Sequence, residues 1–344
     1  MNSKEVKDYA KMLGADLVGI SPMSRFEGAP KQMDARYIFP GAKSMIVLGF
    51  RIPRGSFRGI EEGTLFSNYL TMGYAALNQV YGPMVLWNLT RYIEDQGYEV
   101  IPMMNINGGE AVNTVTGKFR KGWSRPVKKG NPYPDVLVHF RISAFLAGLG
   151  EIGWSKVFLT PEFGPRQRFV ILLTDAELEP DPIYEGKICD RCMLCAKHCH
   201  GNAISTTESV KVTIAGHELE WNKLNELACE KGIQGGTNRE LNPFDGDYPR
   251  MYGYGRALEG ACGCMRACMV HLEERRKIKA QFINRFSNGK QWEIDRSKPY
   301  ELTEDVLEYY GKRGMIEDFD EFIKYNERDN YATAKKNVSN PLID

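Results

Sequence analysis

Cysteine placement constrains this chain more than any other feature of its sequence. All eight cysteines of the 344 residues lie between positions 189 and 268. The first four follow the spacing C-x2-C-x2-C-x3-C, from Cys189 to Cys199. In bacterial ferredoxins, three thiolates of such a run bind one 4Fe-4S cluster and the fourth binds a second cluster. The spacing therefore predicts two 4Fe-4S clusters.

The other four cysteines complete the ligands of both clusters. Three of them form a shorter C-x-C-x3-C run, and the fourth stands between the two runs. Exchange of the last cysteine between the runs, as in ferredoxins, then uses every thiolate. The predicted metal-ligand sets are Cys189, Cys192, Cys195 and Cys268 for one cluster, and Cys199, Cys229, Cys262 and Cys264 for the other.

Other uses of these cysteines fit the pattern less well. Disulfide frameworks belong to short secreted chains. Structural zinc sites prefer two C-x2-C pairs that are separated by a longer spacer. His200 stands where ferredoxins have proline after the fourth cysteine, and we interpret it as a cap or a hydrogen-bond donor to cluster sulfur. Iron–sulfur ligation by the thiolates remains the best interpretation.

Composition excludes several broad classes of protein. Lys and Arg number 45 against 44 Asp and Glu, which argues against a protein built mainly to coat nucleic acid. Hydrophobic residues make up 42 % of the chain, so global disorder is excluded. No run approaches the ~18 apolar residues that span a bilayer. Residues 1–14 carry no apolar signal core and no twin arginine, so we expect a cytoplasmic protein without a membrane partner.

Predicted strands and helices alternate before the cysteines. The pattern predicts a helix capped by Ser3 and ended by Gly14, a helix from Pro83 to Gln96, and strands near 16–20, 43–50, 98–102 and 169–173. This alternation predicts an α/β layer fold. Pro180 and Pro182 mark a linker. We expect an α/β domain over 1–178, a cluster domain over 179–275 and a helical extension over 276–344, with helices near 270–286 and within 300–326.

Two further segments have a functional and a plainer interpretation. Gly148, Gly150 and Gly153 match G-x-G-x-x-G, but no clear strand precedes them and no complete βαβ unit follows, so a dinucleotide site is disfavoured. Six basic side chains lie within 117–130. Such a segment is either a solvated loop or a clamp for a phosphate or an acidic donor protein.

Several ordered motifs carry a family resemblance. The stretches 147–155, 159–168 and 173–178, followed by the cysteine run, resemble the reductive dehalogenase and epoxyqueuosine reductase superfamily, and 14–20 and 40–49 are similar to epoxyqueuosine reductases. The resemblance implies a cobalamin-binding domain with a nitroreductase-like α/β (α+β) core, followed by a two-cluster ferredoxin-like domain. It also implies a base-off corrinoid between the two domains, whose Co(I) state cleaves a carbon–halogen or carbon–oxygen bond.

The resemblance also implies roles for particular residues. Those expected to line the corrinoid, mainly through backbone groups, are Gly148, Gly150, Gly153, Trp154, Ser155, Phe163, Gly164 and Arg166. The alternative is that the glycines only pack a helix against the sheet. Epoxyqueuosine reductases place an acidic proton donor upstream, near Asp135, whereas dehalogenases use a tyrosine backed by a basic side chain. The catalytic candidates are therefore Tyr133, Asp135, His139 and Arg141, with His139 equally able to be a structural histidine.

Three hypotheses follow from these observations. The leading one is an oxygen-sensitive, cobalamin-dependent reductase of a small molecule, fed by a low-potential electron donor of ferredoxin or flavodoxin type. The second is an electron-transfer protein or reductive activator without bound corrinoid. The third is tRNA epoxyqueuosine reduction. Only residues 269–344 follow the last cysteine, and the stretch 317–322 is acidic, so a nucleic-acid partner is disfavoured.

Overall fold

A computed structural model provides the fold of this chain. It describes residues 1–105, 126–132, 134, 136, 138–226, 228–229, 262–289 and 292. These residues all belong to one compact unit. Among them, no helix is long and apolar enough to cross a bilayer.

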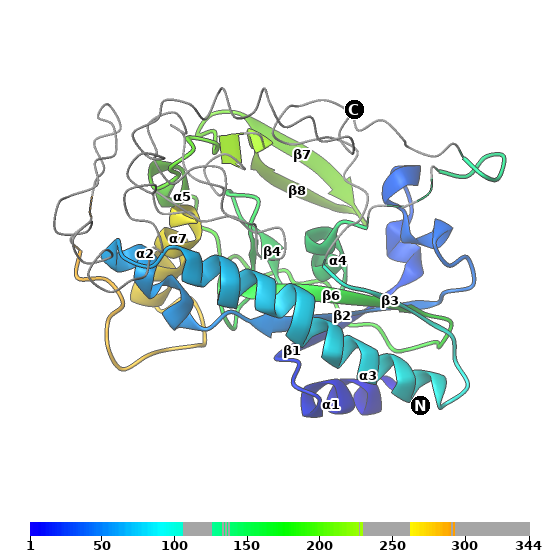
Figure 1. The fold of residues 1–344 in the computed structure, drawn as a ribbon. Coiled ribbons are helices and arrows are strands. Elements are labelled where there is room, and N and C mark those ends of the chain that lie inside the picture. The colour runs from blue at the N-terminus through cyan, green and yellow to red at the C-terminus, as the bar shows by residue number, and fades with distance from the viewer. Residues whose placement is uncertain are drawn as a thin grey trace, which may run out of the picture. The chain divides into compact units, whose positions relative to one another are not determined.

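A four-stranded antiparallel sheet organises the first part of the chain (Figure 1). Its strands, in spatial order, are β1 (Leu17–Pro22), β2 (Ser44–Arg51), β6 (Gln167–Thr174) and β3 (Val100–Met103). All three pairings are antiparallel. The four predicted strands are thus confirmed, and the pairing makes the fold α+β.

Helices and loops cover both faces of this sheet, so its central strands are apolar at nearly every position. In β2, Ile46 and Leu48 join the core beneath α1 (Ser3–Met12) and α3 (Gly82–Glu94). Their neighbours Met45 and Val47 join a second core, on the side of α4 (Phe140–Leu146). Figure 1 shows these helices on opposite sides of the sheet. Burying each such side chain stabilises the fold by about 1.5–3 kcal/mol.

The cap of the N-terminal helix lies one residue earlier than predicted. The cap is Asn2, which has extended backbone angles, whereas Ser3 is already helical. The Asn2 side chain accepts a hydrogen bond from the amide of Glu5, and the Glu5 carboxylate accepts one from the amide of Asn2. This reciprocal pair satisfies two of the free amides of the first turn.

The helix that was predicted from Pro83 has an unexpected extension. Pro83 does lie in its first turn, and the glycine after its end, Gly97, adopts a positive φ of 88°. Two π-helical segments precede it, η5 (Tyr69–Ala75) and η6 (Leu77–Tyr81). Wide turns of this kind are rare and are frequent at functional sites.

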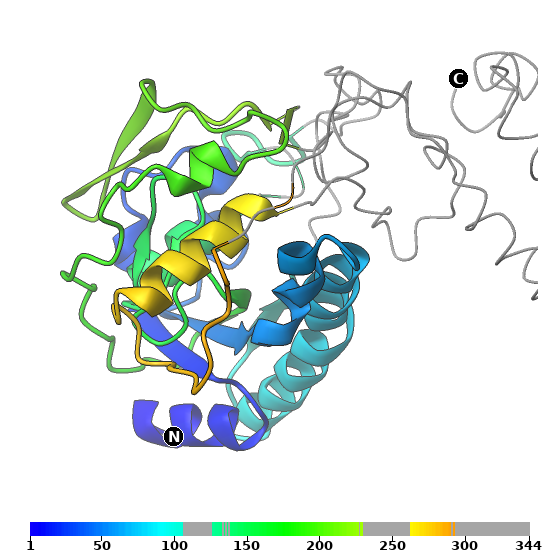
Figure 2. The same cartoon turned by 90° about the vertical axis from the view of Figure 1, so that its left-hand side faces the viewer.

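The cysteine-bearing part folds around one helix. This helix, α7 (Gly263–Glu274), packs against α5 (Leu194–Lys197), as Figure 2 shows. It starts earlier than the predicted helix over 270–286. It also ends earlier, because Arg276 adopts a left-handed φ of 53° that does not continue a helix. The helices predicted within 300–326 lie outside the described residues, and the domain boundaries remain a prediction.

Buried charges tie α7 to the sheet region. The Arg266 guanidinium lies 3.0 Å from the Glu61 carboxylate of α2 (Arg58–Glu62), and both side chains are almost fully buried. Met265 and Met269 enter the core beneath α3. Breaking such a buried pair by removing one partner costs several kcal/mol. The helix that carries two of the cysteines is therefore fixed to the sheet region.

The remaining elements are short. They are η1 (Met23–Phe26), η2 (Lys31–Met33), η3 (Ala35–Tyr37), η4 (Arg54–Phe57), the two-stranded sheet of β4 (Glu151–Ile152) and β5 (Phe158–Leu159), and the hairpin of β7 (Ser209–Ile214) and β8 (His217–Asn222).

Two glycines with similar backbone angles allow a test of close packing. Gly148 has a φ of 75°, and a Cβ there would lie 2.1 Å from the Pro182 carbonyl oxygen. Gly28 has a φ of 82°, and a Cβ there would meet nothing within 4 Å. We expect Gly28→Ala to cost about 1–2 kcal/mol, for the backbone angle alone, and Gly148→Ala to cost clearly more. Parallel urea unfolding of the two variants measures this, and equal losses would contradict the packing.

Candidate functional site

The loop that bears the first cysteines is held by a buried acid. The Glu151 carboxylate accepts hydrogen bonds from the amides of Ile188, at 2.9 Å, and Cys189, at 2.6 Å. Burial raises the pKa of Glu151, while these two amides oppose the shift. The Trp154 amide donates to the Cys189 sulfur at 3.4 Å. The backbone around Cys189 is therefore fixed before any metal binds.

Four thiols gather at one side of α7. Burial, and then the neighbouring thiols of Cys189, Cys195 and Cys192, hold the pKa of Cys268 well above its usual value. Burial likewise raises the pKa of Cys195 to about 11. The structure thus brings together the first predicted set, which we call the outer set because Cys192 is exposed.

The second predicted set gathers at the start of α7. Burial, and then Cys262, Cys199 and Cys229, hold the pKa of Cys264 well above its usual value. Burial and the neighbouring Cys229 thiol raise the pKa of Cys262 to about 12, and the nearby Tyr69 hydroxyl opposes this shift. We call this group the inner set. Four thiols that suppress each other's ionisation need a positively charged partner to become thiolates, which iron supplies.

A polar trio lies beside the outer set. Its ligand atoms, from Asp190, Cys192 and His271, all lie within 4.8 Å of one another. The His271 Nε2 lies 2.8 Å from the Asp190 carboxylate, and Arg275 and Lys277 approach the same carboxylate at 3.9 Å. These contacts already engage Asp190. The trio is an alternative metal site to the outer set, and a variant of Asp190 distinguishes the two sites.

Aromatic and basic side chains surround the inner set. The Tyr69 hydroxyl, in the π-helical segment, donates to the Met265 sulfur at 3.1 Å. Burial, and then the neighbouring Cys262 thiol, hold the pKa of Tyr69 well above its usual value. The Arg168 guanidinium stacks 3.8 Å from the centroid of the Tyr74 ring, and its Nε donates to Asn78 at 3.0 Å. We call Tyr74, Asn78 and Arg168 the inner wall.

One of the predicted catalytic residues joins this wall. Burial lowers the pKa of Arg141, and the like charge of Arg168 lowers it further, while Tyr74 and Cys229 oppose the shift. Arg141 is therefore an electrostatic neighbour of Arg168, Tyr74 and the inner set. Two arginines that repel each other in a desolvated place favour an anion between or beside them.

The other predicted catalytic residues have different outcomes. His139 lies at the N-terminus of α4, where its Nδ1 accepts a hydrogen bond from the Ile142 amide at 3.3 Å. This contact gives His139 a structural role, and its catalytic role remains a prediction. Tyr133 and Asp135 lie outside the described residues.

The predicted corrinoid-lining residues have packing partners within the chain. A Cβ on Gly150 would lie 2.0 Å from the Leu159 oxygen, and one on Gly153 would lie 2.9 Å from the Leu159 side chain. Close packing is thus one reason for these glycines and for Gly148, and their role in lining a corrinoid stays a prediction. Four of the other predicted residues form hydrogen bonds. Trp154 Nε1 donates to the Ser205 oxygen, the Val157 amide donates to Ser155 Oγ, the Phe163 amide donates to Thr160 Oγ1, and Arg166 Nη1 donates to the Ile52 oxygen. Gly164 packs against the Leu272 side chain.

Sequence reasoning missed the inner wall. Arg168 is the last residue of the stretch 159–168 that carries the family resemblance, and its position in β6 was the one available signal. Tyr74 and Asn78 lie in the π-helical segments, whose turns bring them to Arg168. No sequence periodicity indicates such turns.

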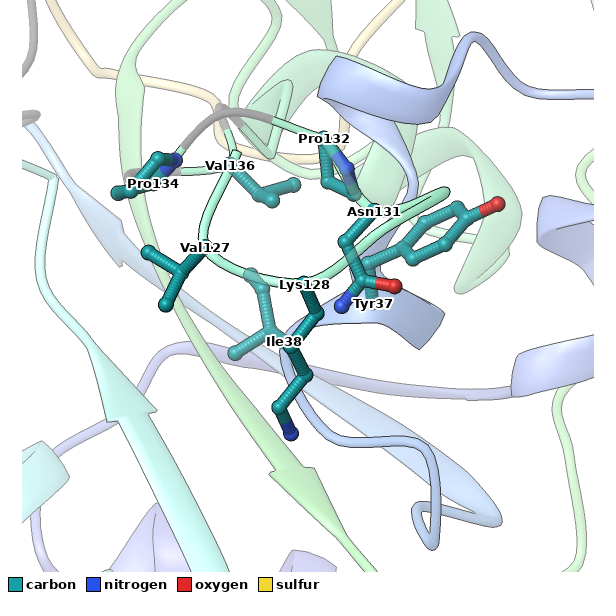
Figure 3. Close-up of a pocket in the computed structure, with 8 residues that line it drawn as sticks. All are labelled: Tyr37, Ile38, Val127, Lys128, Asn131, Pro132, Pro134 and Val136. Carbon is teal, nitrogen blue, oxygen red and sulfur yellow. The ribbon is translucent and has the colours of Figure 1, made fainter. Parts of the chain in front are cut away.

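A pocket lies in another part of the molecule. It has a volume of about 420 Å³ and is formed where the segment 127–136 lies against Tyr37 and Ile38 (Figure 3). This volume suits a drug-sized ligand, and it is smaller than a corrinoid requires. Only residues 127–130 of this segment belong to the basic stretch 117–130, of which the structure describes 126–130.

Comparisons with known proteins bear out the family resemblance. A tetrachloroethene reductive dehalogenase of Desulfitobacterium hafniense is 43 % identical over 231 residues, which is 61 % of this chain and 40 % of that protein. The enzyme of the same name from Sulfurospirillum multivorans is 28 % identical over 357 residues, covering 92 % of this chain and 58 % of that protein. The curated relatives are thus reductive dehalogenases, which are oxidoreductases, and this chain spans about half their length.

One solved structure supports the same fold, and a second was found with a lower score. A catabolic reductive dehalogenase, NpRdhA, in complex with 3-bromo-4-hydroxybenzoic acid matches with a TM-score of 0.50 and 22 % identity, over 80 % of this chain and 34 % of that chain. Epoxyqueuosine reductase from Streptococcus thermophilus matches with a TM-score of 0.44, over 98 % of this chain and 87 % of that one. No protein-family model matches this chain.

The histidine at the start of α4 allows a test by titration. Burial, and then the charge of Arg141, lower the pKa of His139 from 6.5 to about 4. We therefore expect the folded protein to keep His139 neutral from pH 8 down to pH 5. Because the unfolded chain takes up this proton more readily, the free energy of unfolding falls as the pH drops from about 6.5 to 4.

NMR of protein labelled at the histidine ring carbons measures this pKa. His139→Asn identifies the resonance by its loss, and asparagine can still accept the hydrogen bond at this cap position. A His139 resonance that titrates near pH 6.5 would contradict the proposed environment.

Proposed function

We propose that this chain is a cobalamin-dependent reductase of a small molecule, of the reductive dehalogenase type, with two 4Fe-4S clusters. One observation carries the proposal. The eight cysteines form two groups of four, and the inner group adjoins a wall of arginine, tyrosine and asparagine side chains. A redox relay beside a positively charged wall suits reduction of a bound molecule.

The outer and inner sets would hold one cluster each. The outer set has the exposed Cys192, so its cluster is suited to receive electrons from outside the chain. The sets are neighbours, since Cys195 of the outer set lies within electrostatic reach of Cys264 of the inner set. Two such clusters form a one-electron relay, and their potentials respond to polar groups near the sulfurs, such as the Tyr69 hydroxyl near Cys262.

The inner wall fits a corrinoid in its chemistry. The Nδ2 of Asn78 is buried and has no hydrogen-bond partner among the described residues. Such a donor, with Arg168 and Arg141 nearby, suits the amide oxygens and the phosphate that a corrinoid carries. When bound, a corrinoid supplies a strongly reducing cobalt centre for cleavage of a carbon–halogen bond. The nitroreductase-like core and the cobalamin dependence thus remain parts of the proposal.

The chain's own residues would handle protons and anions. Reduction of an organohalide consumes two electrons and one proton, and yields a carbon–hydrogen bond and a halide ion. Tyr74 is the phenol of the inner wall, and Arg168 holds its ring, so we assign Tyr74 as a proton donor beside the predicted Tyr133, Asp135, His139 and Arg141. Arg141 and Arg168 would stabilise the departing halide through their positive charge, and partial desolvation of Arg141 would strengthen its share of this effect.

Anaerobic reconstitution tests the proposed function. The protein is supplied with iron, sulfide and cobalamin, and then assayed with chlorinated and brominated phenols and alkenes under a low-potential reductant. We expect ~8 Fe per chain, a base-off cobalamin spectrum and release of halide. Uptake of iron without any corrinoid would overturn the reductase and favour the electron-transfer alternative.

A cysteine variant tests the ligand assignment. We expect Cys192→Ser to lose the outer cluster and to retain ~4 Fe, because the inner set is complete without it. Asp190→Asn is the matched control, since it removes the carboxylate of the neighbouring trio and no thiolate. Iron analysis and EPR spectra of both variants decide between the sites. Full iron in Cys192→Ser, or loss of iron in Asp190→Asn, would contradict the assignment.

A further inference from the structure

The surface around the outer set is rich in basic side chains. Arg275 and Lys277 each approach the Asp190 carboxylate at 3.9 Å, and Asp190 lies beside the exposed Cys192. Arg276 stands between them in the turn after α7, with an exposed side chain. Lys187 is exposed as well, and it shares the neighbourhood of Glu151 with Lys277. We call these four side chains (Lys187, Arg275, Arg276 and Lys277) the entry surface.

Neighbouring acids offset this charge only in part. Glu220 is paired with Arg191, and Glu274 is paired with Arg285 at 2.6 Å. Asp190, the exposed Glu185 and the half-buried Glu151 oppose the four cations, and His271 already binds Asp190. Lys187 and Arg276 form no ion pair with any described residue. The entry surface therefore carries net positive charge, although the whole chain is almost neutral at +1.

Position makes this charge functionally relevant. Cys192 is the one exposed cysteine of the eight, and its loop is fixed by the bonds from Ile188 and Cys189 to Glu151. Electron tunnelling weakens steeply with distance, so a donor protein has to approach the cluster end that reaches the surface. A rigid, exposed end ringed by cations selects a donor of opposite charge.

We propose that the entry surface is the docking site of a small, acidic, low-potential ferredoxin. This inference rests on the proposed function only for the presence of the outer cluster. In the encounter, one electron passes from the reduced ferredoxin to the outer cluster, so the ferredoxin is oxidised, the cluster is reduced, and no bond or proton is exchanged. Electron-transfer encounters of this kind bury little area and depend on charge steering.

Stopped-flow mixing of reduced plant-type ferredoxin with the reconstituted, corrinoid-free protein tests the proposal. The variant Lys187→Glu with Arg276→Glu reverses two charges that no ion pair engages. The control, Lys11→Glu with Arg91→Glu, makes the same change of net charge at exposed positions of α1 and α3. Iron content and EPR spectra confirm that all three proteins hold their clusters, and reduced methyl viologen confirms that each outer cluster accepts electrons.

At low ionic strength we expect the second-order rate constant of the entry-surface variant to fall ~10-fold or more, and that of the control to change little. The rate constants should converge near 1 M salt, where the screening length is about 3 Å. An unchanged rate in the variant, or an equal fall in the control, would overturn the docking site and leave the proposed function untouched. Absence of clusters in the parent protein would overturn both.

A second variant separates steering from local damage. Arg275→Gln with Lys277→Gln removes two cations that approach Asp190, while the bond from His271 to Asp190 remains. We expect a smaller fall of the same rate constant and a weaker dependence on salt. A parent-like salt dependence would contradict docking at this surface.

Discussion

The cost of gathering eight thiols, all but Cys192 at least partly buried, governs this structure. Burial and mutual repulsion hold the pKa values of Cys262, Cys264 and Cys268 far above the ordinary range. Without a cation these side chains are therefore neutral thiols at pH 7. A metal cluster reverses this balance, because its positive charge stabilises all four thiolates of a set at once. The folding free energy of this region is thereby coupled to metal binding.

The sheet supplies the rigidity that this coupling requires. Both faces of β2 and β6 are buried, so the sheet presents apolar side chains to α3 on one side and to α4 on the other. Met265 and Met269 extend the first of these cores into α7. The pair of Arg266 with Glu61 adds a directional contact that apolar packing cannot give. The cysteines of α7 are thus positioned by the core before any cluster binds.

Local sequence signals predicted the parts of this structure that depend on local chemistry. Strands β1, β2, β3 and β6 and the proline at the start of α3 follow from short-range patterns. The two four-cysteine sets rest on the exchange of cysteines between runs that is known from ferredoxins, and their role as cluster ligands stays a prediction. The cap of α1 was one residue off, because Asn2 and Ser3 can both cap and only backbone geometry decides between them. The end of α7 was missed because the left-handed Arg276 has no glycine to mark it.

Such patterns could not predict the inner wall. Arg168 contacts Tyr74 and Asn78 only because of the π-helical turns and the register of the sheet.

The cations at the two ends of the relay differ in how strongly salt and water screen their charge. The cations of the entry surface are exposed, the Arg275 side chain by 64 %, so salt screens them and they influence mainly the rate of encounter. Arg141 is desolvated beside Arg168, so its field is little screened and acts on whatever charge forms nearby. Ionic strength should therefore slow electron entry far more than it slows chemistry at the inner wall. A reaction that is limited by electron entry at low donor concentration will be sensitive to salt, and one that is limited by chemistry will be insensitive to it.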